Sequence, residues 1–222
     1  MNTGYQIIKE RNKYCILLEK SNESLIKSIT KTNIILGPTI TNNYTVISFH
    51  ANNIQTWKEY SKAGKVSYNT FMRLIYYLSL QLKYLIETGN QTFIGYSPEH
   101  ILVINNERFI YLHVNQLHNI HNECIDITYP FSPDEFYMSP EHRSIKEIPA
   151  TIHYKACYYS LACFIIHGYS NQKHDLKDVN NINNINNINH QLELLPIKNT
   201  KMYYLLKRCI SDDVKNRCIL YI

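Results

Sequence analysis

One segment with helical periodicity constrains the fold of this chain more than any other feature of its sequence. Across residues 67–87 the apolar side chains recur at intervals of three and four positions: Phe71, Leu74, Ile75, Leu78, Leu82, Leu85 and Ile86. This spacing predicts a long helix with one apolar face, which other parts of the chain must bury. Ser67 is a suitable N-cap for this helix, and Gly89 a suitable residue to end it.

Short apolar runs with polar turns precede the predicted helix. Residues 5–20 predict two strands around a turn at 10–13, and a polar stretch follows at 21–32. The runs 34–38 and 44–49 predict two further strands, separated by a turn at 41–43. From residue 54 onward the pattern becomes helical. The N-terminal part of the chain is therefore predicted to be rich in strands.

Beyond the long helix, strands give way to helices. The runs 101–104 and 109–112 flank a polar turn and predict a hairpin, and residues 115–150 predict loops. Helices are predicted at 153–166, stopping at Gly168, then at 201–210 and from 214 to the end. This order predicts an α+β fold. It has a small β-rich N-terminal part, residues 1–53, and a mainly helical C-terminal part, residues 54–222.

Residues 170–191 are of low complexity. They contain a repeat of two asparagines and one isoleucine, which is too polar to form a core of its own. We interpret this segment as a surface insertion in the C-terminal part.

Composition and charge limit the classes of partner. The formal net charge is +5, but the basic residues are scattered instead of gathered into a stripe, so we expect nucleic acid to be an unlikely partner. The N-terminus has no apolar signal segment, and the longest apolar run, 156–166, is too short to span a membrane. The six cysteines form no C-x-x-C motif. We therefore expect a protein of a reducing compartment, the cytoplasm, without membrane contact.

Five motifs, in order along the chain, resemble landmarks of the protein kinase superfamily. Residues 93–103, F-I-G-Y-S-P-E-H-I-L-V, align without gaps on the catalytic loop H-R-D-L-K-P-E-N-I-L-V. Residues 113–115, H-V-N, stand where kinases carry D-F-G, and residues 139–141, S-P-E, resemble A-P-E. Residues 159–162, Y-S-L-A, resemble W-S-L-G. Residues 206–217 resemble the pattern L-x-x-C-L-x-x-D-P-x-x-R near the end of the kinase domain.

This resemblance implies a kinase-like fold with a reduced small lobe in residues 1–53 and a large lobe in residues 54–222. Residues implied to be structural are Pro98, Ser160, and the pair Glu141 and Arg217, which would anchor the activation segment. The resemblance places the hinge that meets adenine at Phe49, His50 and Ala51. The asparagine-rich repeat and the small first lobe resemble kinase-like proteins of large DNA viruses, which would place the protein in the cytoplasm of a host cell.

The residues that perform phosphoryl transfer in kinases are replaced. Gly95 stands at the position of the catalytic aspartate and Ser97 at that of the lysine, while His100 and His113 stand at the two magnesium ligands. The chain has 6 glycines and no G-x-G-x-x-G motif, and Lys20 is the only rough candidate for the nucleotide-binding lysine. We therefore expect a catalytically inactive pseudokinase that binds or scaffolds a protein partner, with no cofactor.

Other interpretations compete with this one. An atypical active serine/threonine kinase using ATP and magnesium would need relocated carboxylates, and Glu99 and Asp126 are the nearest. An unrelated α+β interaction protein is a second alternative. Two further patterns favour packing over chemistry: the Cys157–His153 pair, expected on one helix, and a zinc-like series of His113, His118, His121 and Cys124.

Overall fold

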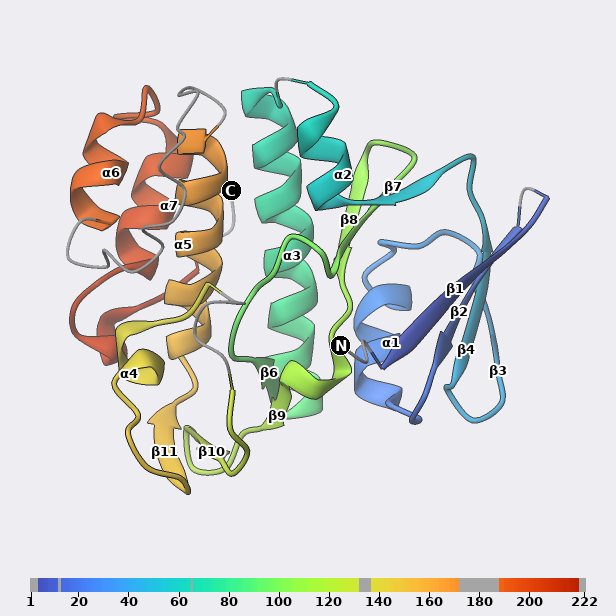
Figure 1. The fold of residues 1–222 in the computed structure, drawn as a ribbon, viewed down its shortest axis with the longest axis horizontal. Helices are drawn as coiled ribbons and strands as arrows, with labels where there is room; N and C mark the ends of the chain where they lie inside the picture. Colours follow the sequence, from blue (N-terminus) through green and yellow to red (C-terminus); the bar gives the residue numbers. More distant parts are fainter. Residues whose placement is uncertain (1–3, 12, 65, 132–136, 172–187, 220–222) are drawn as a thin grey trace. The chain divides into compact units, whose positions relative to one another are not determined.

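The computed structural model describes residues 4–11, 13–64, 66–131, 137–171 and 188–219 (Figure 1). These residues form two compact units. Unit 1 consists of Met1–Gly64, Arg73–Thr92 and Pro98–Leu117, and unit 2 of Lys65–Met72, Phe93–Ser97 and His118–Ile222. Both strands and helices are present, so the predicted α+β class is confirmed. The units do not coincide with the expected division at residue 53, because unit 1 continues past it to Leu117.

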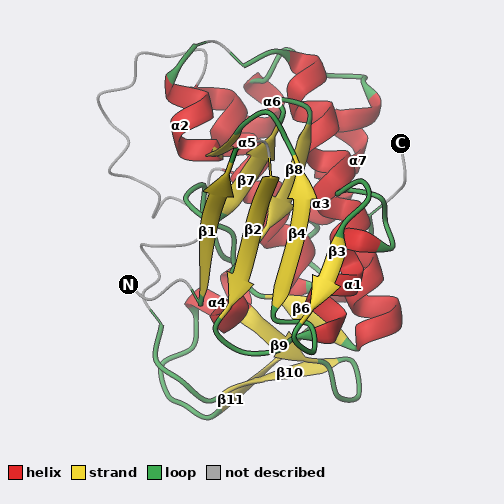
Figure 2. Cartoon of the chain, turned by 90° about the vertical axis from the view of Figure 1, so that its right-hand side faces the viewer, coloured by secondary structure: helices red, strands yellow, loops and turns green. Residues whose placement is uncertain are grey.

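Unit 1 is built on an antiparallel sheet of four strands with the order β1-β2-β4-β3 (Figure 2). Its strands are β1 (Tyr5–Glu10), β2 (Lys13–Leu18), β3 (Thr39–Thr41) and β4 (Val46–His50). Alternate residues of β2 and β4 face the core, among them Ile16 and Ile47, both fully buried. The intervening residues of both strands are partly exposed. The two strands predicted within residues 5–20 are confirmed.

A helix, α1 (Glu23–Thr30), occupies the stretch 21–32 that had been expected to be merely polar. The side chain of Asn22 accepts a hydrogen bond from the Leu25 amide at 2.8 Å and caps it. The strand predicted at 34–38 is wrong. The amides of Ile34 and Ile35 both donate to the Ile29 carbonyl, so these residues close the end of the helix instead.

A second sheet of unit 1 has the order β5-β7-β8. Its strands are β5 (Ile54–Thr56), β7 (Ile101–Ile104) and β8 (Arg108–Tyr111), and the short helix α2 (Trp57–Lys62) follows β5. The predicted hairpin is confirmed, and its turn uses Asn105 and Asn106 with φ of 53° and 59°. Residues 54–56 had been expected to be helical. The helix begins at Trp57 because Thr56 and Glu59 form a capping box there.

The long predicted helix is confirmed as α3 (Tyr68–Gly89). Ser67 caps it, since its hydroxyl accepts a hydrogen bond from the Thr70 amide at 3.1 Å. From Arg73 onward α3 belongs to unit 1. There the buried amide of Gln81 exchanges two hydrogen bonds of 2.9 Å with the backbone of Tyr111 at the end of β8. The helix is thereby fixed to the hairpin.

Unit 2 contains most of the remaining helices. They are α4 (Pro140–Arg143), α5 (Ala156–Asn171), α6 (Ile188–Leu194) and α7 (Lys201–Cys209), of which the last three pack together (Figure 1). β10 (Cys124–Ile127) and β11 (Ala150–His153) pair antiparallel. The 3-10 turns are η1 (Val114–Gln116), in unit 1, and η3 (Val214–Asn216). β6 (Gln91–Phe93) and β9 (Leu117–Asn119) each hold residues of both units.

Three predictions in this region need correction. The helix expected from 153 starts only at Ala156, because His153 belongs to β11. It also passes through Gly168, where a side chain would lie 3.3 Å from the ring of Phe71, so the glycine makes room for that ring. The helix expected from 214 is a single 3-10 turn. Within the low-complexity segment 170–191, residues 172–187 lie outside the described residues, and residues 188–191 begin α6. Of the helices that the structure describes, none has the length and apolar character needed to cross a membrane.

Candidate functional site

A buried ion pair joins two parts of unit 2 that lie far apart in the sequence. Both guanidinium ends of Arg217 contact the carboxylate of Glu141, Nη1 to Oε2 at 2.9 Å and Nη2 to Oε1 at 2.6 Å. The Arg217 side chain is fully buried, whereas that of Glu141 is 28% exposed. This is the bidentate geometry that gives arginine–carboxylate pairs their strength. The pairing expected from the sequence is thus present in the structure.

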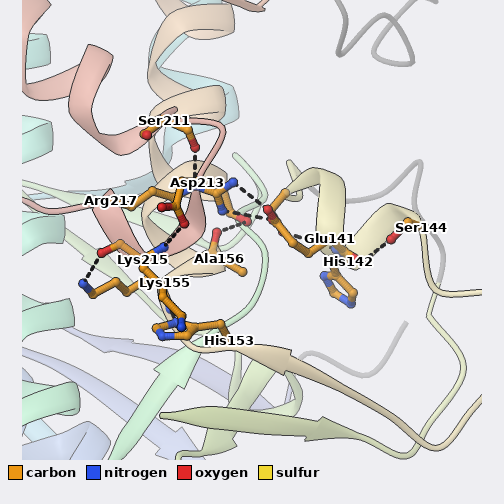
Figure 3. A network of polar contacts seen from close by, with 12 residues as sticks. Glu141, His142, Ser144, His153, Lys155, Ala156, Ser211, Asp213, Lys215 and Arg217 are labelled. Atoms are coloured by element: carbon orange, nitrogen blue, oxygen red, sulfur yellow. Dashed lines mark hydrogen bonds and ion pairs between the residues drawn. The ribbon is translucent and has the colours of Figure 1, made fainter.

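Further contacts hold Arg217 in place. Its Nε donates to the Ser211 carbonyl at 2.8 Å, and its guanidinium lies 4.8 Å from the ring centre of Tyr159 in α5. The segment before it is tied down twice: Asp213 caps η3, and Lys155 donates to the Lys215 carbonyl at 2.7 Å (Figure 3). Three N–H groups of the guanidinium thus have acceptors and its face lies against an aromatic ring, contacts that offset the burial of its charge.

The glutamate is positioned by a short helix. α4 begins after Ser139, whose hydroxyl accepts a hydrogen bond from the His142 amide at 3.3 Å, and Pro140 occupies its first turn. Burial tends to raise the pKa of Glu141. The hydrogen bonds from Arg217 and the backbone, together with the charge of Arg217, outweigh burial and keep this pKa below its usual value. The carboxylate is therefore ionised at neutral pH.

Next to this pair, α4 contributes a histidine to the interior. The ring of His142 is fully buried and lies with its centroid 4.1 Å from that of Phe131. Burial, together with the nearby His118 and Arg143, lowers the pKa of His142 to about 4, although the Ile94 backbone opposes the shift. This side chain is thus a neutral core residue at physiological pH. No motif or spacing pattern in the sequence predicts this role for His142.

Ser160 fixes the segment that carries Gly95 and Ser97, two of the positions that the sequence analysis aligned with kinase catalytic residues. Its hydroxyl donates to the Ile94 carbonyl at 2.9 Å, which ties α5 to the residue before Gly95. Gly95 and Ser97 are both buried, as is Tyr96 between them, whose backbone pairs with that of Tyr137. Neither Gly95 nor Ser97 supplies a carboxylate or an ammonium group.

The other two residues that the sequence analysis aligned with kinase catalytic positions meet in unit 1. The rings of His100 and His113 lie edge to face with centroids 4.2 Å apart, and both side chains are buried. Burial lowers the pKa of His113 to about 4, and the neighbouring His100 adds to the shift. Burial also lowers the pKa of His100, although Glu99 opposes this. The ring of Tyr5, from β1, stands edge-on to His100 at 6.5 Å. The two histidines therefore form a neutral aromatic cluster.

The remaining predicted positions in unit 1 are scattered. Phe49 and Ala51 are buried while His50 is exposed, and Phe49 stacks on Tyr14. The Pro98 carbonyl accepts a hydrogen bond from the Lys58 amide at 3.1 Å. Lys20 is exposed in the turn after β2.

The carboxylates named for an active kinase are engaged at the surface. Glu99 forms an ion pair with Lys58. Asp126, on β10, accepts a hydrogen bond from the Thr151 hydroxyl at 2.9 Å. Each of these contacts uses the carboxylate in the packing of its own unit.

Two sequence patterns, the zinc-like series and the Cys157–His153 pair, do not form the arrangements that metal binding or nucleophilic catalysis would need. Among the described residues no group of three or more histidine, cysteine or acidic side chains can hold a metal ion. In the zinc-like series, His113 contacts His100, and His121 and Cys124 pair only through their backbones. His153 and Cys157 lie on different elements, β11 and α5, so they are not one helical turn apart as expected.

The sequence did not identify the support around Arg217. Tyr159, Ser211 and Lys155 became recognisable only once the fold had brought them together, because none belongs to a spacing pattern with Arg217. A comparison of the sequence with models of protein families finds no match, and none of the curated proteins matches it.

Proposed function

We propose that this chain is a protein-kinase-like module that does not transfer phosphate and acts by binding a protein partner. The observation that carries the proposal is the Glu141–Arg217 pair. The two residues are 76 positions apart, and the kinase pattern alone named them as partners. An accidental match of short motifs gives no reason for two such distant residues to meet in bidentate contact.

The proposed loss of phosphoryl transfer follows from the chemistry of the replaced positions. Transfer needs a carboxylate that receives the proton of the attacking hydroxyl, and oxygen ligands for magnesium. The matching positions hold Gly95, which has no side chain, and the buried neutral imidazoles of His100 and His113. Imidazole is a poor ligand for magnesium.

The proposal is tested by thermal unfolding of the full chain with ATP in the presence of magnesium and, separately, of EDTA. A ligand at a hundred times its dissociation constant stabilises by about 2.7 kcal/mol, which for a protein of this size raises Tm by roughly 5–10 °C. We expect no shift in either condition, and no incorporation of labelled phosphate. A magnesium-dependent rise would contradict the proposal and favour the active kinase.

The two alternatives differ in what else they predict. An active kinase would lose labelled-phosphate incorporation on Glu99→Gln or Asp126→Asn. In a kinase-like but inactive chain, the double substitution His100→Asn and His113→Asp should create a magnesium-dependent rise of Tm with ATP, because it restores oxygen ligands at both positions. An unrelated α+β protein would show no such gain. The matched control is His190→Asn with His121→Asp, which changes two exposed histidines in the same way.

A further inference from the structure

One edge of the unit 1 sheet is a long exposed strand. All six residues of β1, Tyr5–Glu10, pair in unbroken register with β2, and β1 is the outermost strand of the order β1-β2-β4-β3 (Figure 2). Ile7 and Ile8 are 37% and 42% exposed. The opposite edge, β3, has only three residues. β1 is therefore the longer template for adding a further strand to this sheet.

β1 lacks two of the devices that usually protect an edge strand. Its sequence contains no proline, and the unbroken register with β2 leaves no β-bulge. Lys9 could guard the edge, but its ammonium group lies 5.5 Å from the ring centre of Tyr14 on the neighbouring strand. The charge that would repel another strand is thus drawn over the sheet.

The hairpin geometry decides which backbone groups face outward. Glu10 and Lys13 close the turn between β1 and β2, and the pair that closes a two-residue turn is hydrogen-bonded. Hydrogen-bonded pairs alternate along antiparallel strands, so Gln6, Ile8 and Glu10 direct their backbone groups to β2. Ile7 and Lys9 therefore direct theirs to the open edge.

We propose that β1 pairs antiparallel with β1 of a second copy of this chain, around a twofold axis at Ile8. Ile8 then lies opposite the second copy's Ile8, Ile7 opposite Lys9, and Gln6 opposite Glu10. The outward backbone groups of Ile7 and Lys9 meet as a hydrogen-bonded pair, and the two Ile8 residues form the closer, non-hydrogen-bonded pair. The two sheets become one sheet of eight strands.

This register is more favourable than the two neighbouring ones, which also align outward backbone groups. An axis at Lys9 would place two ammonium groups opposite each other, which destabilises a strand pair. An axis at Ile7 would place the amide of Gln6 opposite the apolar Ile8. The axis at Ile8 pairs two β-branched side chains and places no like charges opposite each other. The side chains of β1 are therefore complementary to those of an identical antiparallel strand, which favours a second copy of the chain over an unrelated segment as the partner. Its small contact area implies a weak dimer.

The test is sedimentation velocity of the full chain over a concentration range of about 5–500 μM, where weak dimers appear. We expect the sedimentation coefficient to rise with concentration. Ile8→Lys and Ile8→Glu should each abolish that rise, because each places like charges across the axis. An equimolar mixture of the two variants should restore it, since lysine then faces glutamate. Ile40→Lys and Ile40→Glu on β3, where Ile40 is 37% exposed, are the matched controls and should leave the dimer intact.

Three results would overturn the proposal. One is a wild-type chain that stays monomeric throughout the range, which would leave the edge for an extended segment of another protein. Another is a dimer that survives both Ile8 substitutions. The third is a mixture of the two variants that stays monomeric. Should an Ile8 variant fail to fold, hydrogen exchange in the wild type still decides, because the amides of Ile7 and Lys9 must exchange more slowly at high than at low concentration.

Discussion

At the residue scale, the Glu141–Arg217 pair shows what a buried charge needs. The Arg217 side chain is fully buried and combines two carboxylate contacts, one carbonyl acceptor and an aromatic face. Without them the desolvation of a guanidinium would cost several kcal/mol. The pair therefore holds α4 and the end of the described chain in one arrangement, in which neither partner is dispensable.

Removing either partner should destabilise unit 2. We expect Glu141→Ala to lower the free energy of unfolding by about 3 kcal/mol, the low end for breaking a buried pair, because Glu141 is itself 28% exposed. Arg217→Lys should also destabilise, since an ammonium group cannot make the bidentate contact. Urea unfolding of both single variants and the double variant measures the coupling. Lys155→Ala, which removes one exposed hydrogen bond, is the control and should cost under about 1 kcal/mol.

His142 should make stability fall in acid. Its pKa is about 4 in the folded protein and near 6.5 in the unfolded chain, so below pH 6.5 only the unfolded state takes up the proton. The stabilising contribution is complete above pH 6.5 and is lost as the pH falls to about 4, at most roughly 3 kcal/mol.

Unfolding curves between pH 7 and pH 4 would measure this loss. His142→Leu should flatten the pH dependence by that share, while His113 and His167, whose pKa values burial lowers to about 4 as well, continue to contribute. An unchanged slope in the variant would contradict the assignment to His142. His190→Gln, at an exposed position, is the control.

At the scale of elements, capping residues and close approaches decide where helices end and touch. Ser67, Thr56 and Asn22 each begin a helix with a side-chain hydrogen bond to a backbone amide. At its other end, α3 finishes at Gly89, where a side chain would lie 2.9 Å from Cβ of Ser24 in α1. The glycine allows the two helices to approach each other at that point.

Gly89→Ala should destabilise unit 1 even though alanine is the better helix former. The added methyl group would meet a carbon that is fixed to the backbone of α1, and such overpacking costs about 1–3 kcal/mol against a gain of up to about 1 kcal/mol in helix propensity. Ser24→Gly in the same chain should cancel the clash. The interaction energy of the double-mutant cycle is therefore expected to be favourable. Gly64→Ala, with no atom within 4 Å of the new methyl group, is the control.

At the scale of the whole molecule, the chain returns to unit 1 after leaving it. Residues late in unit 1 are tied to early ones: Arg108 donates to the Ile34 carbonyl at 3.4 Å, and Trp57 packs edge-on against Phe109. The sheet that had been expected to form a lobe on its own therefore shares its unit with most of α3 and with the β7–β8 hairpin.

A fragment ending at residue 53 should consequently not fold. It lacks Arg73–Thr92 and Pro98–Leu117, and so few residues bury too little surface to offset the loss of conformational entropy. Residues 1–117 contain the whole of unit 1 and should give a cooperative unfolding transition. Circular dichroism during heating of the two fragments measures this. A sharp transition in the shorter fragment would show that the sheet is independent of α3.

Local patterns in the sequence determined the elements whose signals are themselves local. The 3.6-residue periodicity of α3, its cap at Ser67, the β1–β2 hairpin and the asparagine turn between β7 and β8 all act within a few residues, so they were predictable. The kinase pattern also named Glu141 and Arg217 as a pair, because it carries information about distant contacts that periodicity lacks.

Only the tertiary structure decided the rest, because it depends on what each segment meets. Residues 34–35 are apolar enough for a strand, yet the end of α1 takes their amides. Gly168 resembles a helix stop, yet α5 continues through it. The side chain that Gly168 lacks leaves room for the ring of Phe71. No local pattern in the sequence indicates that His100 and His113 meet, and only the fold places their rings in contact. Burial and long-range hydrogen bonds are properties of the folded chain, so no window of sequence contains them.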